Sequence, residues 1–248
     1  MDDDTAMALA LGDSLIDCGG LDPADLMSRF VAWRDHGAYS CTGSCFDIGS
    51  TVSASLDRWI RTGEPFAGST YPLSAGNGSL MRLAPVALRY WRDRQALARV
   101  AADQSRTTHA APEAVGACVA FAQILADAIQ GLPRSQVLRQ RSGDHPPGVA
   151  AILAGSGRGK PRDEVRSSGF VLDSLEAALW SVGRTADFRT AILTAANLGG
   201  DADTTAAIAG QLAGALYGLS GIPQEWLAKP AWRGRIKALA KKLAGEDL

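Results

Sequence analysis

The amino-acid sequence predicts an all-α protein, a compact bundle of many helices. Apolar residues recur at spacings of three and four along most of the 248 residues, as they do on the buried face of an amphipathic helix. Alternating strand patterns bounded by turn pairs are scarce. Small residues crowd one side of residues 204–219, which would let other helices approach that segment closely. No internal repeat is found, and the length alone allows one large domain or two small ones.

Seven segments carry the helical spacing, each with a stripe of apolar residues on one side. They are residues 5–16, 24–33, 49–61, 81–92, 111–129, 170–182 and 204–219. In the last of these segments the stripe consists of Ile208, Leu212 and Leu216.

Composition excludes several classes of protein. The formal net charge is −1, whereas nucleic-acid binders usually carry a clear basic excess. The first residues lack a basic region and a cleavage signal, and no apolar run approaches the roughly 20 residues that cross a bilayer. Four cysteines, Cys18, Cys41, Cys45 and Cys118, are too scattered for a disulfide scaffold and lack the partners of a zinc site. We expect reduced cysteines in a cytoplasmic protein without nucleic-acid or membrane partners.

Residues 131–168 break the helical pattern. They hold seven Arg or Lys residues against three acidic ones, and the stretch "AGSGRGKP" invites comparison with a phosphate-binding P-loop. That comparison fails, because the motif needs Gly at Ala154 and Ser or Thr at Pro161. We expect a short helix around residues 149–153 and otherwise a solvated basic loop, with attraction of an anionic substrate as the alternative.

Two acidic helix starts lie almost at opposite ends of the chain. The stretch "NLGGDADTTAAIAGQLAGALYG" places Asp201, Asp203 and Thr204 where the last strong helix begins. One aspartate would suffice to cap a helix and to interact with its dipole, so the second needs another explanation. Residues 2–4 are three aspartates followed by Thr5, again at the opening of a helix.

These two starts could face each other in a bundle and bring Asp3, Asp4, Asp201 and Asp203 together. Without metal such a cluster would repel itself, whereas two divalent cations would balance its four charges. Oxygen ligands select Mg²⁺ or Mn²⁺, with Ca²⁺ fitting less well. From the residues alone, two separate helix caps and an acidic terminus remain an equally good interpretation.

The order of the motifs resembles the ADP-ribosylglycohydrolase family, the relatives of the dinitrogenase reductase-activating glycohydrolase. The resemblance runs through "DDTAMALAL", "FDIGSTV", "GNGSLMRLAPVAL", "SRTTHAAPEAV", "GFVLDSLEAALW" and "LGGDADTTAAIAGQLAGALYG". It implies a single all-α domain over residues 1–248 that folds around two Mg²⁺ or Mn²⁺ ions. The metal ligands that it implies are Asp3, Asp4, Asp201, Asp203 and Thr204.

The resemblance also implies catalytic and substrate-binding residues. Asp47 matches a family acid near the scissile bond, although an Asp there could simply cap a helix. His109 matches the family histidine beside bound ADP-ribose, or it is a structural histidine. Phe170 could stack on the ligand or pack in the core. The glycine-rich "GNGS" could offer backbone N–H groups to phosphate or ribose oxygens, or form only a turn ending in a cap. Its four residues are Gly76, Asn77, Gly78 and Ser79.

Two features depart from the family pattern. Members usually carry an earlier helix with a Gly-Asp-x-x-Gly-type motif, and in some of them that part holds a catalytic acid, so we expect an N-terminally shortened version of the domain. Asp2 stands where the family usually has Thr or Ser. A carboxylate can replace the hydroxyl as a metal ligand, at the cost of added negative charge.

The resulting hypothesis is a metal-dependent hydrolase that removes ADP-ribose from a protein or a small-molecule conjugate. It would cleave the N- or O-glycosidic bond between ADP-ribose and an acceptor such as arginine. Asp47, or a ligand carboxylate such as Asp4, would handle the proton and steady the positive charge on the sugar. The alternative is a catalytically impaired relative that binds ADP-ribose or serves a structural role. We also expect two unequal metal sites, with the stronger one held mainly by Asp201, Asp203 and Thr204.

Overall fold

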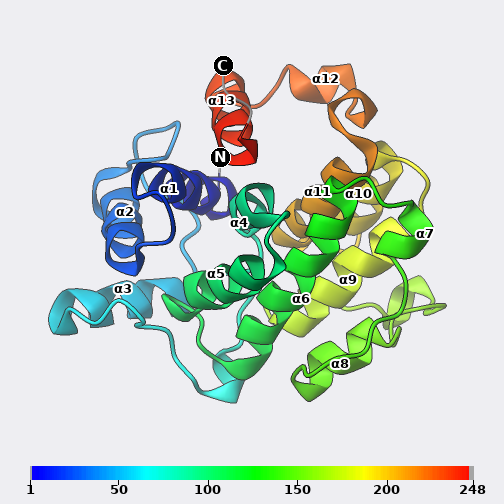
Figure 1. The fold of residues 1–248 in the computed structure, drawn as a ribbon, viewed down its shortest axis with the longest axis horizontal. Coiled ribbons are helices and arrows are strands. Elements are labelled where there is room, and N and C mark those ends of the chain that lie inside the picture. Colours follow the sequence, from blue (N-terminus) through cyan, green and yellow to red (C-terminus); the bar gives the residue numbers. More distant parts are fainter. Residues whose placement is uncertain (1, 246–248) are drawn as a thin grey trace.

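The computed structural model describes residues 2–245, and helices make up nearly all of its regular structure (Figure 1). Within this range there are thirteen α-helices, three short 3₁₀ helices and two isolated β-bridges. The all-α prediction is therefore confirmed. The α-helices are α1 (Asp3–Asp17), α2 (Pro23–His36), α3 (Ser50–Thr62), α4 (Ala84–Tyr90), α5 (Arg94–Arg106), α6 (Pro112–Ile129), α7 (Arg134–Val137), α8 (Pro147–Leu153), α9 (Val171–Gly183), α10 (Phe188–Ala196), α11 (Ala202–Tyr217), α12 (Gln224–Leu227) and α13 (Arg233–Ala244). The 3₁₀ helices are η1 (Pro72–Ser74), η2 (Arg162–Glu164) and η3 (Leu219–Gly221).

Each of the seven predicted helical segments contains a helix, and all seven match it to within three residues at either end. The helix in the predicted segment 81–92 is shorter than expected at both ends, since α4 begins only at Ala84 and ends at Tyr90. The chain before it is held in tight turns, in which the Leu80 and Met81 amides donate to the Asn77 carbonyl at 2.8 and 3.1 Å. The short helix expected around residues 149–153 is α8.

Three longer helices, α5, α10 and α13, were not predicted. Their stripes are short, as in α10, or consist largely of alanines among charged residues, as in α5. In α13 the sequence "RGRIKALAKKLA" is strongly basic, and only Leu239 and Leu243 are buried. Tertiary packing therefore stabilises these helices more than a continuous apolar face does.

Helix α6 forms the centre of the bundle, with α5 and α9 on either side of it (Figure 1). It also packs against α4, α8 and α11, and most of its residues are buried. By length and composition α6 could cross a membrane, but 67% of it is buried within the fold, as in the core helix of a bundle. The main apolar core includes residues from α1 through α13.

The two ends of the described chain pack against each other. Helix α13 lies against α1, where a Cβ atom at Gly12 would come within 2.8 Å of the Leu239 side chain. Arg235 of α13 adds an ion pair with Asp13 of α1 at 2.8 Å. Gly12 therefore permits a close helix contact that fixes the position of α1.

Candidate active site

The acidic start of α1 is largely buried. Asp2 is the N-cap, and its Oδ1 accepts hydrogen bonds from the amide and the hydroxyl of Thr5, both at 3.3 Å. The next two residues, Asp3 and Asp4, are only 8% and 4% exposed. Asp3 accepts a hydrogen bond from the Asp4 amide at 3.1 Å. The capping explanation therefore accounts for Asp2 and leaves the two buried carboxyl groups unexplained.

Asp4 is the least satisfied of these side chains. Both of its carboxyl oxygens are buried, and neither has a hydrogen-bond partner among the described residues. A buried charged group without a partner carries a large free-energy cost, which proteins usually offset with a counter-charge or by protonation. Asp4 therefore either holds a proton or needs a positive charge that the described residues do not supply.

The other acids of both helix starts surround this position. Burial, followed by the negative charges of Asp2, Asp3, Asp203 and Asp201, raises the pKa of Asp4 to about 8. Such coupling requires the start of α11 to lie near the start of α1. The two acidic helix starts predicted from the sequence are therefore brought together by the fold.

Asp47 belongs to the same electrostatic neighbourhood. Burial, and then the charges of Asp47 and Asp2, raise the pKa of Asp3 to about 7. Asp47 itself is exposed and lies just before α3 with a φ of 61°, in the left-handed region that few non-glycine residues adopt. Asp tolerates this conformation better than most residues, and such strain is concentrated at functional sites. Asp47 is also outside α3, whose N-cap is Gly49, so it does not cap that helix.

Asp201 is the N-cap residue of α11, yet its side chain makes no capping hydrogen bond. Its Oδ2 instead accepts a hydrogen bond from Asn77 Nδ2 at 2.7 Å. The preceding backbone depends on glycine: Gly200 has a φ of 64°, and a Cβ atom there would lie 2.0 Å from the Ser167 carbonyl oxygen. The "GGD" sequence thus aims Asp201 away from its own helix and toward the centre of the site.

Asp203 and Thr204 occupy the first turn of α11. Asp203 is exposed, whereas Thr204 is 7% exposed. In the part of the chain that the structure describes, no basic side chain forms an ion pair with the acids of the two helix starts, Asp2, Asp3, Asp4, Asp201 and Asp203. The site is therefore an acidic cluster without an internal cation.

Asn77 connects the glycine-rich loop to two helices. Besides Asp201, its amide nitrogen donates to Ser174 Oγ of α9 at 2.8 Å. The loop backbone pairs with the segment before α9, because the Asn77 amide donates to the Gly169 carbonyl at 3.0 Å, next to the bridge between Gly76 and Phe170. The predicted substrate residues Gly76, Asn77 and Phe170 are therefore adjacent. Phe170 is half-buried and packs partly against the core.

The His109 ring packs against the glycine-rich loop. A Cβ atom at Gly76 or Gly78 would lie 3.1 or 2.8 Å from this ring, so both glycines permit close packing on the imidazole. Burial, followed by the charge of Arg82, lowers the pKa of His109 to about 3. The imidazole is therefore neutral near pH 7, and its Nδ1 lies 2.9 Å from Thr108 Oγ1.

The Ser79 hydroxyl lies inside the protein. Ser79 is fully buried, accepts a hydrogen bond from Ser105 Oγ at 2.8 Å and contacts the Cys118 thiol at 3.4 Å. The side chain thus anchors the end of the glycine-rich loop in the core. The Gly76 and Asn77 amides donate to the Ser74 and Gly169 carbonyls, so the Gly78 amide remains as the donor of these three that could face a substrate.

Arg82 is a site-supporting residue that the sequence analysis did not single out, although it stands in the "GNGSLMR" motif. Its guanidinium is fully buried, lies over the Phe30 ring at 4.7 Å and donates to Thr108 Oγ1 at 2.9 Å. Burial lowers its pKa to about 9, and Asp3 is one of the acids that oppose this shift. The available signal was an Arg directly after the apolar pair Leu80 and Met81, in a stretch that reads as core. An Arg in the core needs a dedicated set of hydrogen-bond partners.

The donor set fits hard divalent cations in charge and in chemistry, because it consists of carboxylates and one threonine hydroxyl. The unpartnered oxygens of Asp4 are the strongest indication of this fit. The carboxylates do not converge on one point, however: no three Asp, Glu, His or Cys side chains in the described range form a group that could hold an ion as they stand. Metal binding at this site would therefore require rotation of the carboxylates.

Comparisons with known proteins agree with the motifs. The family model for ADP-ribosylglycohydrolase matches residues 1–247. The ADP-ribosylarginine hydrolase Tri1 of Pseudomonas putida (strain GB-1) is 45% identical over 241 residues, which cover 97% of this chain and 65% of that protein. The ADP-ribosyl-[dinitrogen reductase] glycohydrolase of Rhodospirillum rubrum is 32% identical over 238 residues, covering 92% of this chain and 72% of that protein.

A solved structure described as an "ADP-ribosylglycohydrolase-related protein complex" matches the whole chain with a TM-score of 0.87 and 37% identity, and 82% of that structure's chain is covered. The chain thus spans slightly less than two thirds of the Tri1 hydrolase, and its fold agrees with this structure along its full length. The family model, the relatives and the fold lead to one conclusion: the chain belongs to the ADP-ribosylglycohydrolase family.

Proposed function

We propose that this protein is a hydrolase that removes ADP-ribose from ADP-ribosylated arginine, and that it depends on Mg²⁺ or Mn²⁺. The Tri1 relative is named an ADP-ribosylarginine hydrolase, which favours arginine as the acceptor. The observation that carries the proposal is Asp4, whose two buried oxygens have no partner among the described residues at the meeting point of α1 and α11.

The ligand set of this proposal contains Asp3, Asp4, Asp201, Asp203 and Thr204, with Asp2 as an additional carboxylate. When bound, the cations would supply positive charge that orients a water molecule and lowers its pKa near the ribose. Asn77 holds one oxygen of Asp201 at 2.7 Å, which leaves the other oxygen free to ligate. Because Asn77 also binds Ser174, it fixes α11 relative to α9.

The remaining residues bind and orient the substrate. The Gly78 amide can donate to a phosphate or ribose oxygen, because the Gly76 and Asn77 amides already donate to the Ser74 and Gly169 carbonyls. The neutral imidazole of His109 keeps that loop close-packed. Phe170, beside Gly76, can cover an apolar face of the ligand. Asp47 is exposed next to Asp3, where it can accept a proton and stabilise positive charge that develops on the ribose.

Incubation of the protein with an ADP-ribosylated arginine peptide and Mn²⁺ or Mg²⁺ tests the proposal. We expect release of free ADP-ribose, measured by chromatography, and its loss in EDTA. Asp203→Ala should abolish most of the release. Asp144→Ala should not, because Asp144 is an exposed acid of the basic segment, away from the helix starts. Absence of release from arginine-, serine- and nucleotide-linked substrates would overturn the enzymatic assignment.

Calorimetric titration with ADP-ribose separates this proposal from its alternative. A metal-dependent binding isotherm together with turnover supports the hydrolase. Binding without turnover of any of these substrates would instead indicate a catalytically impaired ADP-ribose binder.

A further inference from the structure

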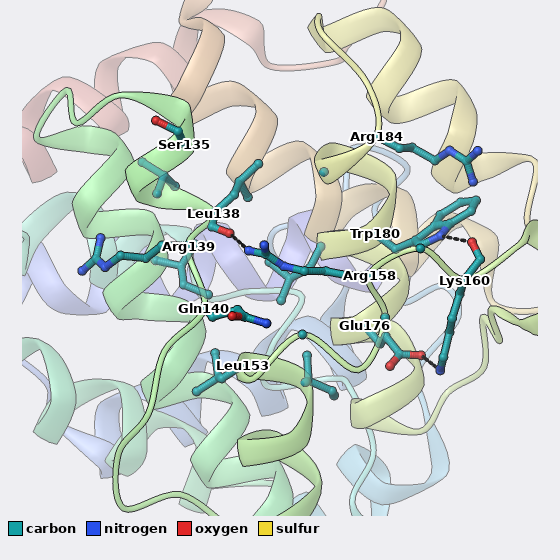
Figure 2. Close-up of a pocket in the computed structure, with 18 of the residues that line it drawn as sticks. Ser135, Leu138, Arg139, Gln140, Leu153, Arg158, Lys160, Glu176, Trp180 and Arg184 are labelled. Atoms are coloured by element: carbon teal, nitrogen blue, oxygen red, sulfur yellow. Dashed lines mark hydrogen bonds and ion pairs between the residues drawn. The ribbon is translucent and has the colours of Figure 1, made fainter.

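A cavity of about 740 Å³ lies beside the C-terminal half of α9 (Figure 2). It is lined by that part of α9, by α7 and the residues after it, by the end of α8 and the glycine-rich turn that follows, and by Ile124 of α6. None of the residues assigned to the active site lines it. Cavities of roughly 300–1,000 Å³ are the usual size of small-molecule sites, so this volume suffices for a ligand.

The wall of this cavity carries an excess of positive charge. Five basic residues line it, namely Arg134, Arg139, Arg158, Lys160 and Arg184, against a single acid, Glu176. Two of the five are neutralised. Lys160 forms an ion pair with Glu176 at 2.6 Å, and Arg139 forms one with Asp127 at 3.2 Å.

The other three guanidinium groups meet no carboxylate within ion-pair distance in the described residues. Arg134 donates to the carbonyl oxygens at the end of α9, including that of Gly183 at 2.7 Å, and its Nε is buried without a partner. Arg184 lies over the Trp180 ring at 4.2 Å. Arg158 crosses the middle of the cavity and donates only to the Leu138 carbonyl (Figure 2). These three guanidinium groups are therefore without an ion-pair partner among the described residues, although carbonyl oxygens already engage Arg134, and Arg158 and Arg184 are exposed.

The glycines of "GSGRGKP" explain how Arg158 reaches this position. Gly155 and Gly159 have φ values of 101° and 74°, which side chains rarely allow. A Cβ atom at Gly157 would lie 2.8 Å from the Glu176 side chain, so this residue packs directly against α9. The stretch that fails as a P-loop is thus a tight turn that places Arg158 and Lys160 over the cavity.

Apolar side chains form much of the remaining wall, among them Val137, Leu138, Leu153 and Leu179, together with the polar Ser135 and Gln140. A small inorganic anion would leave this apolar surface uncovered. A ligand that combines an anionic group with an apolar or planar body would satisfy both parts of the wall. Guanidinium groups pair with phosphate in a bidentate geometry, which makes phosphate the favoured anionic group.

We propose that this cavity is a second ligand site, separate from the active site, for an organic phosphate of the nucleotide class. The phosphate groups bind at Arg158, with Arg134 and Arg184 adding positive charge, and the body of the ligand packs against the apolar wall. A concave site of this size suits a small molecule better than an extended acidic peptide.

Calorimetry in EDTA with ADP, pyrophosphate and adenosine as separate probes tests the proposal. We expect ADP to bind more tightly than pyrophosphate, and adenosine to bind weakly or not at all. Arg158→Glu should weaken ADP binding by at least about tenfold, and Arg184→Ala should weaken it less. Arg166→Glu is the matched control, because Arg166 is an exposed residue of the same segment that does not line the cavity.

The active site provides the second control. Asn77→Ala should leave ADP binding at the cavity intact, and Arg158→Glu should leave hydrolysis of ADP-ribosylarginine intact. Failure of hydrolysis with retained, Arg158-dependent ADP binding would leave this inference standing. ADP binding that is lost in Asn77→Ala and unchanged in Arg158→Glu would overturn it, as would the absence of ADP and pyrophosphate binding. Binding of a hexaglutamate peptide in place of both probes would also overturn it.

Discussion

Asn77 Nδ2 lies 2.7 Å from Asp201 Oδ2, a hydrogen bond that joins residues 124 positions apart in the chain. The same nitrogen donates to Ser174 Oγ, so a single buried amide links the glycine-rich loop, α9 and α11. The bond uses one oxygen of Asp201 and orients the other. Asn77 therefore fixes the position of the glycine-rich loop relative to the acidic cluster.

Replacing Asn77 should uncouple these parts. In Asn77→Ala we expect hydrolysis and cation affinity to fall by roughly 10–100-fold, the range typical for loss of a group that orients a metal ligand. Asn77→Asp should lower hydrolysis further than Asn77→Ala, because it places another negative charge beside Asp201. Turnover and the cation-induced thermal shift measure both effects. Asn197→Ala, at an exposed asparagine before α11, serves as the control. Wild-type turnover in Asn77→Ala would contradict the assigned role.

The stability of the metal-free protein should depend on pH through Asp3 and Asp4. Their pKa values are raised from 3.8 to about 7 and about 8, first by burial and then by neighbouring acids. The folded state thus binds more protons than the unfolded state between pH 4 and pH 8. The stabilisation that the protonated forms of Asp3 and Asp4 contribute is therefore complete below pH 4 and is lost as pH rises through this window.

We therefore expect the melting temperature in EDTA to fall between pH 5 and pH 8.5, by about 2–4 °C for each kcal/mol lost. Divalent cations should reverse most of this decrease. Asp4→Asn should flatten the pH profile and also abolish part of the cation effect. A metal-free melting temperature that rises steadily to pH 8.5 would show that the buried carboxyl groups have another counter-charge.

The two cation sites should be unequal. Mn²⁺ should raise the melting temperature, because a ligand that binds only the folded state stabilises it by mass action. Asp203→Ala should remove most of that increase. Anomalous scattering from manganese-soaked crystals should give its stronger peak beside Asp201 and Asp203. A strong peak far from both residues, or an equal thermal shift in Asp203→Ala, would refute the assignment.

Asp2 should contribute more as a cap than as a ligand. Asp2→Ala removes the hydrogen bonds to Thr5 and should destabilise the protein by about 1 kcal/mol. Asp2→Ser keeps a capping oxygen and should restore most of that loss. Both variants should retain the Mn²⁺-induced thermal shift. Loss of that shift in both would mean that Asp2 is an essential ligand.

Gly200→Ala should disrupt the site through the backbone. A methyl group there would lie 2.0 Å from the Ser167 carbonyl oxygen, at a φ of 64°. We expect destabilisation of about 2 kcal/mol or more, together with reduced cation binding because Asp201 is displaced. Gly183→Ala is the control, since a Cβ atom there meets nothing within 4 Å and its φ is not positive. Thermal unfolding with and without Mn²⁺ compares the two variants.

The sequence predicted the main helices, because periodicity is a local signal. It left the meeting of the two acidic helix starts as one of two equal interpretations, and only the order of the family motifs favoured it. The sequence could not predict how single side chains would point. Ser79 and Asn77 are two positions apart in one motif, yet one hydroxyl lies in the core and one amide binds Asp201. Arg82 was missed for the same reason, since its partners on α5 and beyond are set by tertiary packing. The cavity beside α9 likewise needs four separate segments to assemble.

The contact between α13 and α1 has a consequence for synthesis of the protein on the ribosome. Helix α1 is synthesised before α13, but the leucines that cover Gly12 belong to α13, the last helix of the described chain. Until α13 has left the exit tunnel, that face of α1 remains uncovered, and Asp3 and Asp4 lack the start of α11, which follows them by almost 200 residues. Local α-helical contacts can form early, but this closure between distant segments comes late. A nascent chain stalled before α11 should therefore be unable to bind the cations that the finished protein is expected to need.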